Sequence, residues 1–254
     1  MKAILKCLLK YYLKYITKLV ILIHRPLIIG VTGSVNEVFT KEEIKRQLTE
    51  AGYEVRSNPK NFNTEIGLPL AILNLPSGYN SYENWLPIIL RAFKSIIEPK
   101  FPKILVLGLG VAEPGDMKYL MSLVRPKIAV ITDITQRYIE SFEDMDKLAG
   151  EYELLIKTVT ARKGHLILNY DNPRIRKLAE FDKAPVKSVF FGLNETGPKN
   201  YWHGKIVEKN LNGQKIKITN DGLISEHQIP RFGQHHVYAL LIGLIIKKIV
   251  LNLK

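Results

Sequence analysis

The sequence has little cysteine and lacks the usual marks of a secreted chain or of a membrane span in its first 25 residues. Cys7 is the only cysteine among 254 residues, which excludes an internal disulfide and favours a reducing compartment. No lysine-free apolar run before Arg25 reaches the length of about 18 residues that a transmembrane helix needs. A small-residue cleavage site typical of a signal peptide is also missing. These absences predict a cytoplasmic protein.

Acidic residues are absent before Glu37, although the chain as a whole holds 24 of them against 37 lysines and arginines, a net charge of +13. Five lysines recur at four-residue spacing in this stretch, between aliphatic residues and tyrosines: Lys2, Lys6, Lys10, Lys14 and Lys18. Lysines four apart form one ridge of a helix and leave a wide apolar face.

Residues 1–25 are therefore predicted to form a basic amphipathic helix that lies on an anionic membrane surface, at the inner face of the plasma membrane. The alternative is a helix that packs its apolar face on the domain or on a partner, with its lysines solvated. Nucleic acid is not expected as a partner, because the surplus lacks the arginine and aromatic interleaving of a nucleic-acid groove.

Beyond Pro26, short apolar runs alternate with helical stretches. The strand-like runs cover residues 27–31, 104–107, 128–131 and 166–168, and the helical stretches cover 41–51, 85–97, 117–124, about 142–156 and 174–180. This alternation predicts an α/β fold with a mostly parallel sheet and helices on both faces. Residues from about 186 to 230, with Asn212-Gly213 between two alternating runs, predict a small antiparallel meander. A final helix is expected over residues 237–253.

The turn after the first predicted strand has the layout of a phosphate-binding loop. Gly33 and Ser34 lie in a turn between an apolar strand and a helix, where backbone N–H groups and the helix dipole receive an anion. Thr40 followed by Glu43 forms a capping box, so the helix is expected to begin at Thr40.

This segment, residues 30–43, resembles the phosphate loop of the Mur ligase family. The resemblance continues in Asn61 to Pro69, Pro114-Gly115-Asp116, residues 128–132, residues 168–174 and Gly233-Gln234-His235. It implies that residues 26–254 form the central ATP-binding domain of that family. The basic helix stands in place of the family's N-terminal domain, and the C-terminal domain has no counterpart.

In that family the central domain uses ATP and Mg²⁺ to activate a carboxylate as an acyl phosphate, which an amine then attacks. The resemblance implies that the charged positions for this work have changed here. In the loop, Asn36 replaces a glycine, Glu37 replaces the lysine and Val38 replaces a magnesium-binding threonine. Gly108 replaces a magnesium-binding glutamate, and Tyr138 replaces a metal-binding histidine. Glu151 replaces a lysine that is carbamoylated in many members of the family. An acid in the place of a lysine repels a triphosphate, and glycine offers no side-chain oxygen to Mg²⁺.

These changes predict a non-catalytic pseudoenzyme or scaffold of cell-wall precursor synthesis that needs no cofactor. One alternative is an active ATP-dependent ligase that joins a carboxylate and an amine and holds Mg²⁺ through the replacement ligands Glu113, Asp116, Asp133 and Glu140. Another is nucleotide binding without turnover, at the residues Gly33, Ser34, Thr40, Asn61, Asn63 and Asn169. Asparagines in such loops form local turns just as often. The expected partners are the membrane surface and another cell-wall ligase, or a chain that supplies the missing domains.

Overall fold

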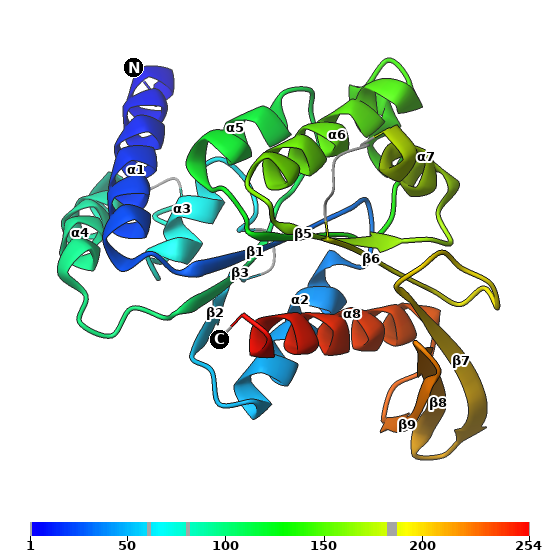
Figure 1. Ribbon diagram of the computed structural model, residues 1–254. Coiled ribbons are helices and arrows are strands. Elements are labelled where there is room, and N and C mark those ends of the chain that lie inside the picture. The colour runs from blue at the N-terminus through cyan, green and yellow to red at the C-terminus, as the bar shows by residue number, and fades with distance from the viewer. Residues whose placement is uncertain (1, 60–61, 80–81, 182–186, 254) are drawn as a thin grey trace.

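A twisted sheet lies between two layers of helices (Figure 1). The computed structural model describes residues 2–59, 62–79, 82–181 and 187–253, and in this part of the chain the sheet has nine strands in the order β2-β3-β1-β4-β5-β6-β7-β8-β9. Neighbouring strands from β2 to β7 run parallel, and β7, β8 and β9 run antiparallel. The predicted fold class is therefore confirmed.

The strands of the parallel part are β1 (Leu27–Thr32), β2 (Val55–Ser57), β3 (Ile104–Gly108), β4 (Ile128–Ile131), β5 (His165–Asn169) and β6 (Lys187–Gly192). The antiparallel end consists of β7 (Tyr201–Asn210), β8 (Gly213–Asn220) and β9 (Leu223–Ile229). Every residue of β3 and β4 is buried. Strands covered on both faces are apolar throughout, which is why these runs show no alternation in the sequence.

The helices divide between the two faces of the sheet (Figure 1). One face carries α1 (Lys2–His24), α3 (Gly67–Ile72), α4 (Tyr82–Lys94), α5 (Asp116–Leu123), α6 (Met145–Ala161) and α7 (Pro173–Phe181). The other face carries α2 (Glu37–Glu50) and α8 (Gln234–Leu251). Two short 3-10 helices are η1 (Ser95–Ile97) and η2 (Gln136–Ser141).

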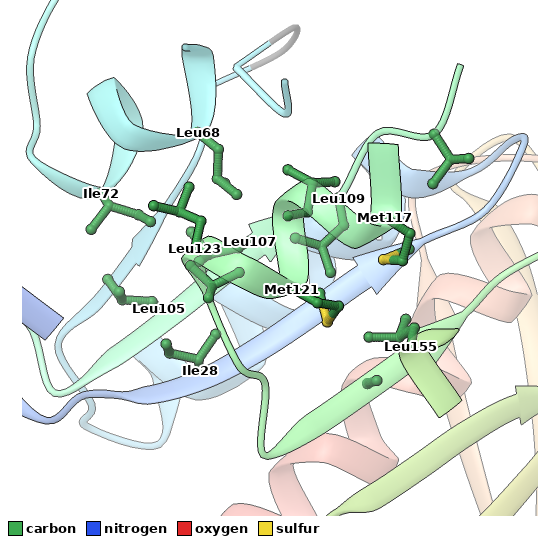
Figure 2. Packing of buried hydrophobic residues seen from close by; sticks show 14 of the residues in the cluster. Ile28, Leu68, Ile72, Leu105, Leu107, Leu109, Met117, Met121, Leu123 and Leu155 are labelled. Atoms are coloured by element: carbon green, nitrogen blue, oxygen red, sulfur yellow. The ribbon is translucent and has the colours of Figure 1, made fainter. Parts of the chain in front are cut away.

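Alternate residues of each central strand supply the cores on the two faces. Ile28 and Leu105 belong to one core, which includes Met117 of α5 (Figure 2). Ile29 belongs to the other core, together with Ile44 of α2. Each fully buried side chain of this size stabilises the fold by roughly 1.5–3 kcal/mol relative to an exposed one.

Helix α8 is, within the described residues, the one helix long and apolar enough to cross a membrane by length and composition alone. Half of this segment is buried, and Leu240, Leu241 and Ile245 belong to the core that α8 shares with α2. Packing inside the domain therefore accounts for its apolar composition.

Helix α1 forms where the sequence predicts it, and one of its faces is part of the domain core. Leu13 and Val20 have no exposed surface, and the Tyr12 hydroxyl donates to the Ile89 carbonyl at 2.8 Å. Lys10 forms an ion pair with Glu65, and Lys14 donates to the Ser122 hydroxyl at 2.7 Å. The alternative of packing on the domain is thus observed for this face, and two of the five ridge lysines contact protein. Lys6 and Lys18 are exposed, and Lys2 lies at the start of the helix.

The expected capping box at Thr40 is wrong. Helix α2 begins at Glu37, after Asn36, whose backbone has the left-handed conformation with φ of 67°. Asparagine tolerates this conformation better than other residues with side chains, so the helix starts before the Thr40-Glu43 signal. Thr40 instead lies inside the helix, buried, with a hydroxyl that has no hydrogen-bond partner among the described residues.

The antiparallel meander is smaller than predicted. The run at residues 188–191 forms β6, which is parallel to both β5 and β7, so only β7 to β9 are antiparallel. The Asn212-Gly213 hairpin is confirmed, since Asn210 pairs with Gly213 across a two-residue loop. The short elements β2 and α3 were not predicted, because three and six residues are too few for a periodic pattern.

Candidate functional site

The turn of residues 33–36 lies at the carboxyl ends of the parallel strands, where ligands bind in sheets of this type. It joins β1 to α2, with the ends of β3 and β4 on either side. Gly33 has φ of 144°, and a side chain there would meet the Thr132 hydroxyl at 2.1 Å. The Thr132 hydroxyl donates to the Val35 carbonyl at 2.6 Å. The end of β4 therefore fixes the shape of the turn.

Ser34 makes its polar contacts within the protein. Its backbone N–H donates to the Asp133 carbonyl at 2.8 Å, and its hydroxyl oxygen accepts from the Thr135 N–H at 3.0 Å. The Ser34 carbonyl accepts from the Arg137 guanidinium at 3.4 Å. These bonds leave the Ser34 backbone N–H engaged where a phosphate-binding loop would direct it to a ligand.

Glu37 is the first residue of α2 and turns its carboxylate toward the end of β3. A Cβ built on Gly108 would lie 1.9 Å from Glu37 Oε1, so the carboxylate fills the space in which any side chain at position 108 would begin. The Glu37 side chain is only 14% exposed. The acid at position 37 and the glycine at position 108 are therefore sterically dependent on each other.

Lys41 neutralises this carboxylate from one turn further along α2. Lys41 Nζ lies 3.2 Å from Glu37 Oε1, and the Lys41 side chain is 4% exposed. Helical side chains lean toward the N-terminus of the helix, which brings residues i and i+4 together. The ammonium also donates to the Asn58 carbonyl at 3.2 Å and to the Asn58 side-chain oxygen at 3.1 Å.

Asn58 connects this ion pair to β3. Its side-chain oxygen accepts from the Gly108 N–H at 2.7 Å, and its amide nitrogen donates to the Phe62 carbonyl at 2.9 Å. Since Asn58 is itself buried, Glu37, Lys41, Asn58 and Gly108 form a closed polar network inside the protein. Removing one partner of a buried pair of this kind is strongly destabilising, because it leaves an unpaired charge inside the protein.

A cavity of about 290 Å³ adjoins the network. Its lining includes Glu37, Asn63, Glu65, Asp116 and Tyr138. Of the three acids among these residues, Glu37 pairs with Lys41 and Glu65 pairs with Lys10, whereas Asp116 forms no ion pair within the described residues. The residues present do not fit a magnesium-bound triphosphate, because the loop offers an acid and Gly108 supplies no ligand.

The three asparagines predicted to lie near a nucleotide have separate positions. Asn63 lines the cavity and donates to Glu37 Oε2 at 3.3 Å. Asn169 is buried, donates to the Thr132 carbonyl at 2.8 Å and accepts from the Asp171 N–H at 3.0 Å, so its amide joins β5 to β4. Asn61 lies outside the described residues.

Glu151, which the resemblance assigns to the position of the family's carbamoylated lysine, caps a neighbouring helix. Its two carboxylate oxygens accept from the N–H groups of Gly115 and Met117, each at 2.8 Å. These groups belong to the start of α5, where a negative charge stabilises the helix. Val38 is half-buried in the first turn of α2.

The four acids considered as replacement metal ligands are not brought together. Asp116 accepts from the N–H groups of Ala112 and Glu113 at 2.9 Å. Asp133 accepts from the Ile134 N–H at 2.9 Å and from the Asn172 amide, and Glu113 and Glu140 are exposed. In the described part of the chain, no three His, Cys, Asp or Glu side chains are grouped closely enough to hold a metal ion.

Sequence reasoning missed the roles of Lys41 and Asn58. The spacing of Glu37 and Lys41 is the i, i+4 spacing of helical ion pairs, and it was available as a signal once the helix start was known. The sequence around Asn58 gave no signal of its role, because Gly108, whose N–H donates to the Asn58 side chain, is 50 residues away.

The fold and this turn define an α/β domain with a strand-turn-helix unit at the carboxyl edge of the parallel part of its sheet. Residues 31–246 match the model of the family described as the Mur ligase middle domain, and the chain belongs to this family.

Similar proteins agree with this assignment. The chain is 28% identical over 210 residues to the UDP-N-acetylmuramoyl-tripeptide–D-alanyl-D-alanine ligase of Bacillus subtilis, covering 83% of this chain and 38% of that protein. The corresponding ligase of Mycobacterium leprae is 27% identical over 217 residues, covering 83% of this chain and 37% of that protein. The chain thus spans well under half the length of these curated relatives.

Solved structures show the same fold at lower identity. MurF from Acinetobacter baumannii matches with a TM-score of 0.72 and 17% identity, covering 96% of this chain and 46% of that one. MurF ligase from Thermotoga maritima, solved in complex with ADP, matches with a TM-score of 0.69 and 19% identity, covering 92% of this chain and 49% of that one.

Proposed function

We propose that this protein is a non-catalytic Mur-ligase-like protein of peptidoglycan precursor synthesis. The observation that carries the proposal is the placement of the Glu37 carboxylate over Gly108, in an ion pair with Lys41. This pair places the protein's own charges where the family resemblance implies a triphosphate and its metal. The domain then acts by binding a partner, such as another cell-wall ligase or a chain that supplies the other domains of the family.

The proposed place of action is the cytoplasmic face of the plasma membrane. Helix α1 supports this through exposed apolar residues on the side that does not pack on the domain, including Ile4 and Leu8. The exposed lysines Lys6 and Lys18 lie on the same helix, and α1 contains no acidic residue. An exposed apolar face flanked by lysines favours an anionic lipid surface.

An assay of ADP release tests the loss of catalysis. Purified protein is incubated with ATP, Mg²⁺, UDP-N-acetylmuramoyl-tripeptide and D-alanyl-D-alanine, the substrates in the names of its relatives. The proposal predicts ADP release at the rate of a protein-free control. Release that requires both peptide substrates would show that the protein is an active ligase instead.

An active ATP-dependent carboxylate–amine ligase is the second function with support from a specific observation. The Lys41 ammonium lies at the carboxyl edge, 3.2 Å from the Glu37 carboxylate, so a cation and a potential oxygen ligand for magnesium are present in the region. Release of this pair on binding a partner chain would free both groups. The ADP assay repeated with the complete ligase of the same cell, inactivated by mutation, separates this function from the first.

A further inference from the structure

The amino-terminal edge of the sheet, opposite the Glu37 site, carries a row of basic residues. Five adjacent strands in the order β3-β1-β4-β5-β6 each begin at a lysine or within two residues after a lysine or arginine. The residues of this basic row are Arg25, Lys100, Lys103, Arg125, Lys127, Arg162, Lys163 and Lys187. Because parallel neighbours lie about 4.8 Å apart, the five strand starts extend over roughly 20 Å.

Backbone contacts confirm that these starts are side by side. The Leu27 N–H donates to the Lys103 carbonyl at 2.8 Å, and the Lys127 N–H donates to the Ile28 carbonyl at 3.0 Å. The His165 N–H donates to the Lys127 carbonyl at 2.9 Å, and His165 pairs with Lys187.

The basic row is not neutralised by acids. Within the described residues, none of its eight members takes part in an ion pair. Seven are exposed, and Lys127 is half-buried. Glu98, close in sequence to Lys100, pairs with Arg56 instead, and Glu54 adjoins the outer end of the row before β2. The edge therefore keeps a strong positive potential.

His165 reports this potential from inside the row. Burial lowers the pKa of His165, and the charges of Lys187 and Lys127 lower it further. Two cations close enough to act on one half-buried imidazole act together on any anion that approaches the edge.

Exposed aliphatic residues border the basic row at its α1 end. His24 Nε2 donates to the Ile96 carbonyl at 3.1 Å, and the His24 ring stacks on Phe101 with ring centroids 4.5 Å apart, which holds the end of α1 against η1. Leu22 is 66% exposed and Ile97 is 80% exposed. Large aliphatic side chains gain free energy from entering lipid, whereas a nucleic acid offers them no apolar environment.

We propose that the amino-terminal edge of the sheet is a docking surface for an anionic lipid bilayer, with the basic row on the headgroups and Leu22 and Ile97 in the interfacial layer. The inference extends the membrane association of the proposed function but depends mainly on the basic row, whose eight residues lie outside α1, together with Leu22 of α1 and Ile97 of η1. It also sets the orientation of the domain. The carboxyl edge with the Glu37 cavity faces away from the membrane and stays open to a partner in the cytoplasm.

Vesicle flotation of the full-length protein tests this surface. The edge variant carries Lys103→Gln, Arg125→Gln, Lys163→Gln and Lys187→Gln. The control variant removes the same charge from exposed lysines elsewhere that form no ion pair within the described residues, through Lys118→Gln, Lys177→Gln, Lys199→Gln and Lys209→Gln. The α1 variant carries Lys6→Gln and Lys18→Gln. Vesicles contain either phosphatidylcholine alone or 30% phosphatidylglycerol (about one anionic lipid in three), and equal thermal midpoints show that the variants are folded.

The inference predicts binding of the natural protein to the anionic vesicles only. The edge variant is expected to bind at least about tenfold more weakly, since each basic residue near the surface contributes on the order of 1 kcal/mol, and the control variant is expected to bind like the natural protein. Equal losses in the edge and control variants would overturn the inference, because binding would then follow net charge alone. A loss in the α1 variant only would overturn it while leaving membrane association intact.

Two further outcomes would also overturn the inference. If the natural protein binds neither vesicle, both this surface and the proposed membrane location are wrong, and the ADP assay remains the test of lost catalysis. If it binds a 20-base-pair DNA duplex but no vesicle, and the edge variant loses the DNA, the edge is a nucleic-acid surface. All binding measurements use the same ionic strength of about 0.1 M, where the Debye length is about 10 Å, so that screening by salt is equal for every variant.

Discussion

The carboxylate of Glu37 lies over the α-carbon of Gly108, so close that a Cβ at position 108 would meet Oε1 at 1.9 Å. The resemblance to the Mur ligase family implies a lysine and a glutamate at these two positions. In this protein Glu37 of α2 supplies the acid and β3 ends in Gly108. Lys41 of α2 forms an ion pair with Glu37. The Glu37 carboxylate can take this position only because residue 108 has no side chain.

Gly108→Ala is expected to destabilise the protein by about 1–3 kcal/mol, as overpacking of a buried site does. The new methyl group displaces the Glu37 carboxylate from Lys41. In a Glu37→Gly background the two closest contacts are removed and only the flexible end of Lys41, 2.9 Å from the built Cβ, has to shift, so the same substitution is expected to cost much less. Urea denaturation of the two single variants and the double variant measures this coupling. An equal cost of Gly108→Ala in both backgrounds would show that the carboxylate does not occupy this space.

Lys41→Met is expected to cost about 3–5 kcal/mol, because it leaves the Glu37 carboxylate buried without its partner. Adding Glu37→Gln removes that unpaired charge and is expected to restore most of the lost stability. The matched control is Lys157→Met on α6, whose ion pair with Glu153 is exposed and is worth about 0–1 kcal/mol. Additive effects of the Lys41 and Glu37 substitutions would contradict the buried network.

His165 is expected to titrate below its ordinary value of about 6.5, because burial and the charges of Lys187 and Lys127 lower its pKa. Lys187→Gln raises the pKa of His165, but not to the ordinary value, since burial is the larger cause. Because the unfolded chain takes up this proton more readily, the stability contributed by neutral His165 is full above pH 6.5 and decreases as the pH falls below it. NMR titration of the imidazole measures the shift, and no response to Lys187→Gln would contradict the basic row.

Two leucines of α1 provide a matched test of how the helix packs. Leu13 is fully buried and Leu22 is 66% exposed, so Leu13→Ala is expected to cost about 2–5 kcal/mol and Leu22→Ala less than about 0.5 kcal/mol. Thermal or urea unfolding of the two variants measures the difference. Equal small effects would indicate that α1 detaches from the domain in solution.

Much of the fold could be predicted from the sequence because the central strands and the longer helices have strong patterns. The run at residues 128–131 was predicted with its observed bounds, since it lies between clear breaks. The start of α2 was predicted at Thr40 but lies at Glu37. The residue before it, Asn36, has a left-handed backbone conformation and makes no side-chain capping hydrogen bond, so the sequence does not mark this start.

The site was predictable in its residues but less so in its contacts. The position of Glu37 in the loop is a local feature of the sequence, and its meaning came from the family resemblance. The contacts of Gly108 with Glu37 and with Asn58 join three separate segments of the sheet edge, and only the three-dimensional structure brings these together. The same holds for the basic row, whose members are spread from Arg25 to Lys187 and become neighbours through the strand order.

Isothermal titration with magnesium-ATP tests the central claim, that the Glu37–Lys41 pair excludes the nucleotide. The natural protein is compared with a variant that restores the family residues, Asn36→Gly with Glu37→Lys and Gly108→Glu, so that Lys41 again has an acid beside it. We expect the natural protein to bind no tighter than about 1 mM and the restored variant to bind more tightly, in a magnesium-dependent way. Micromolar, magnesium-dependent binding by the natural protein would contradict the account.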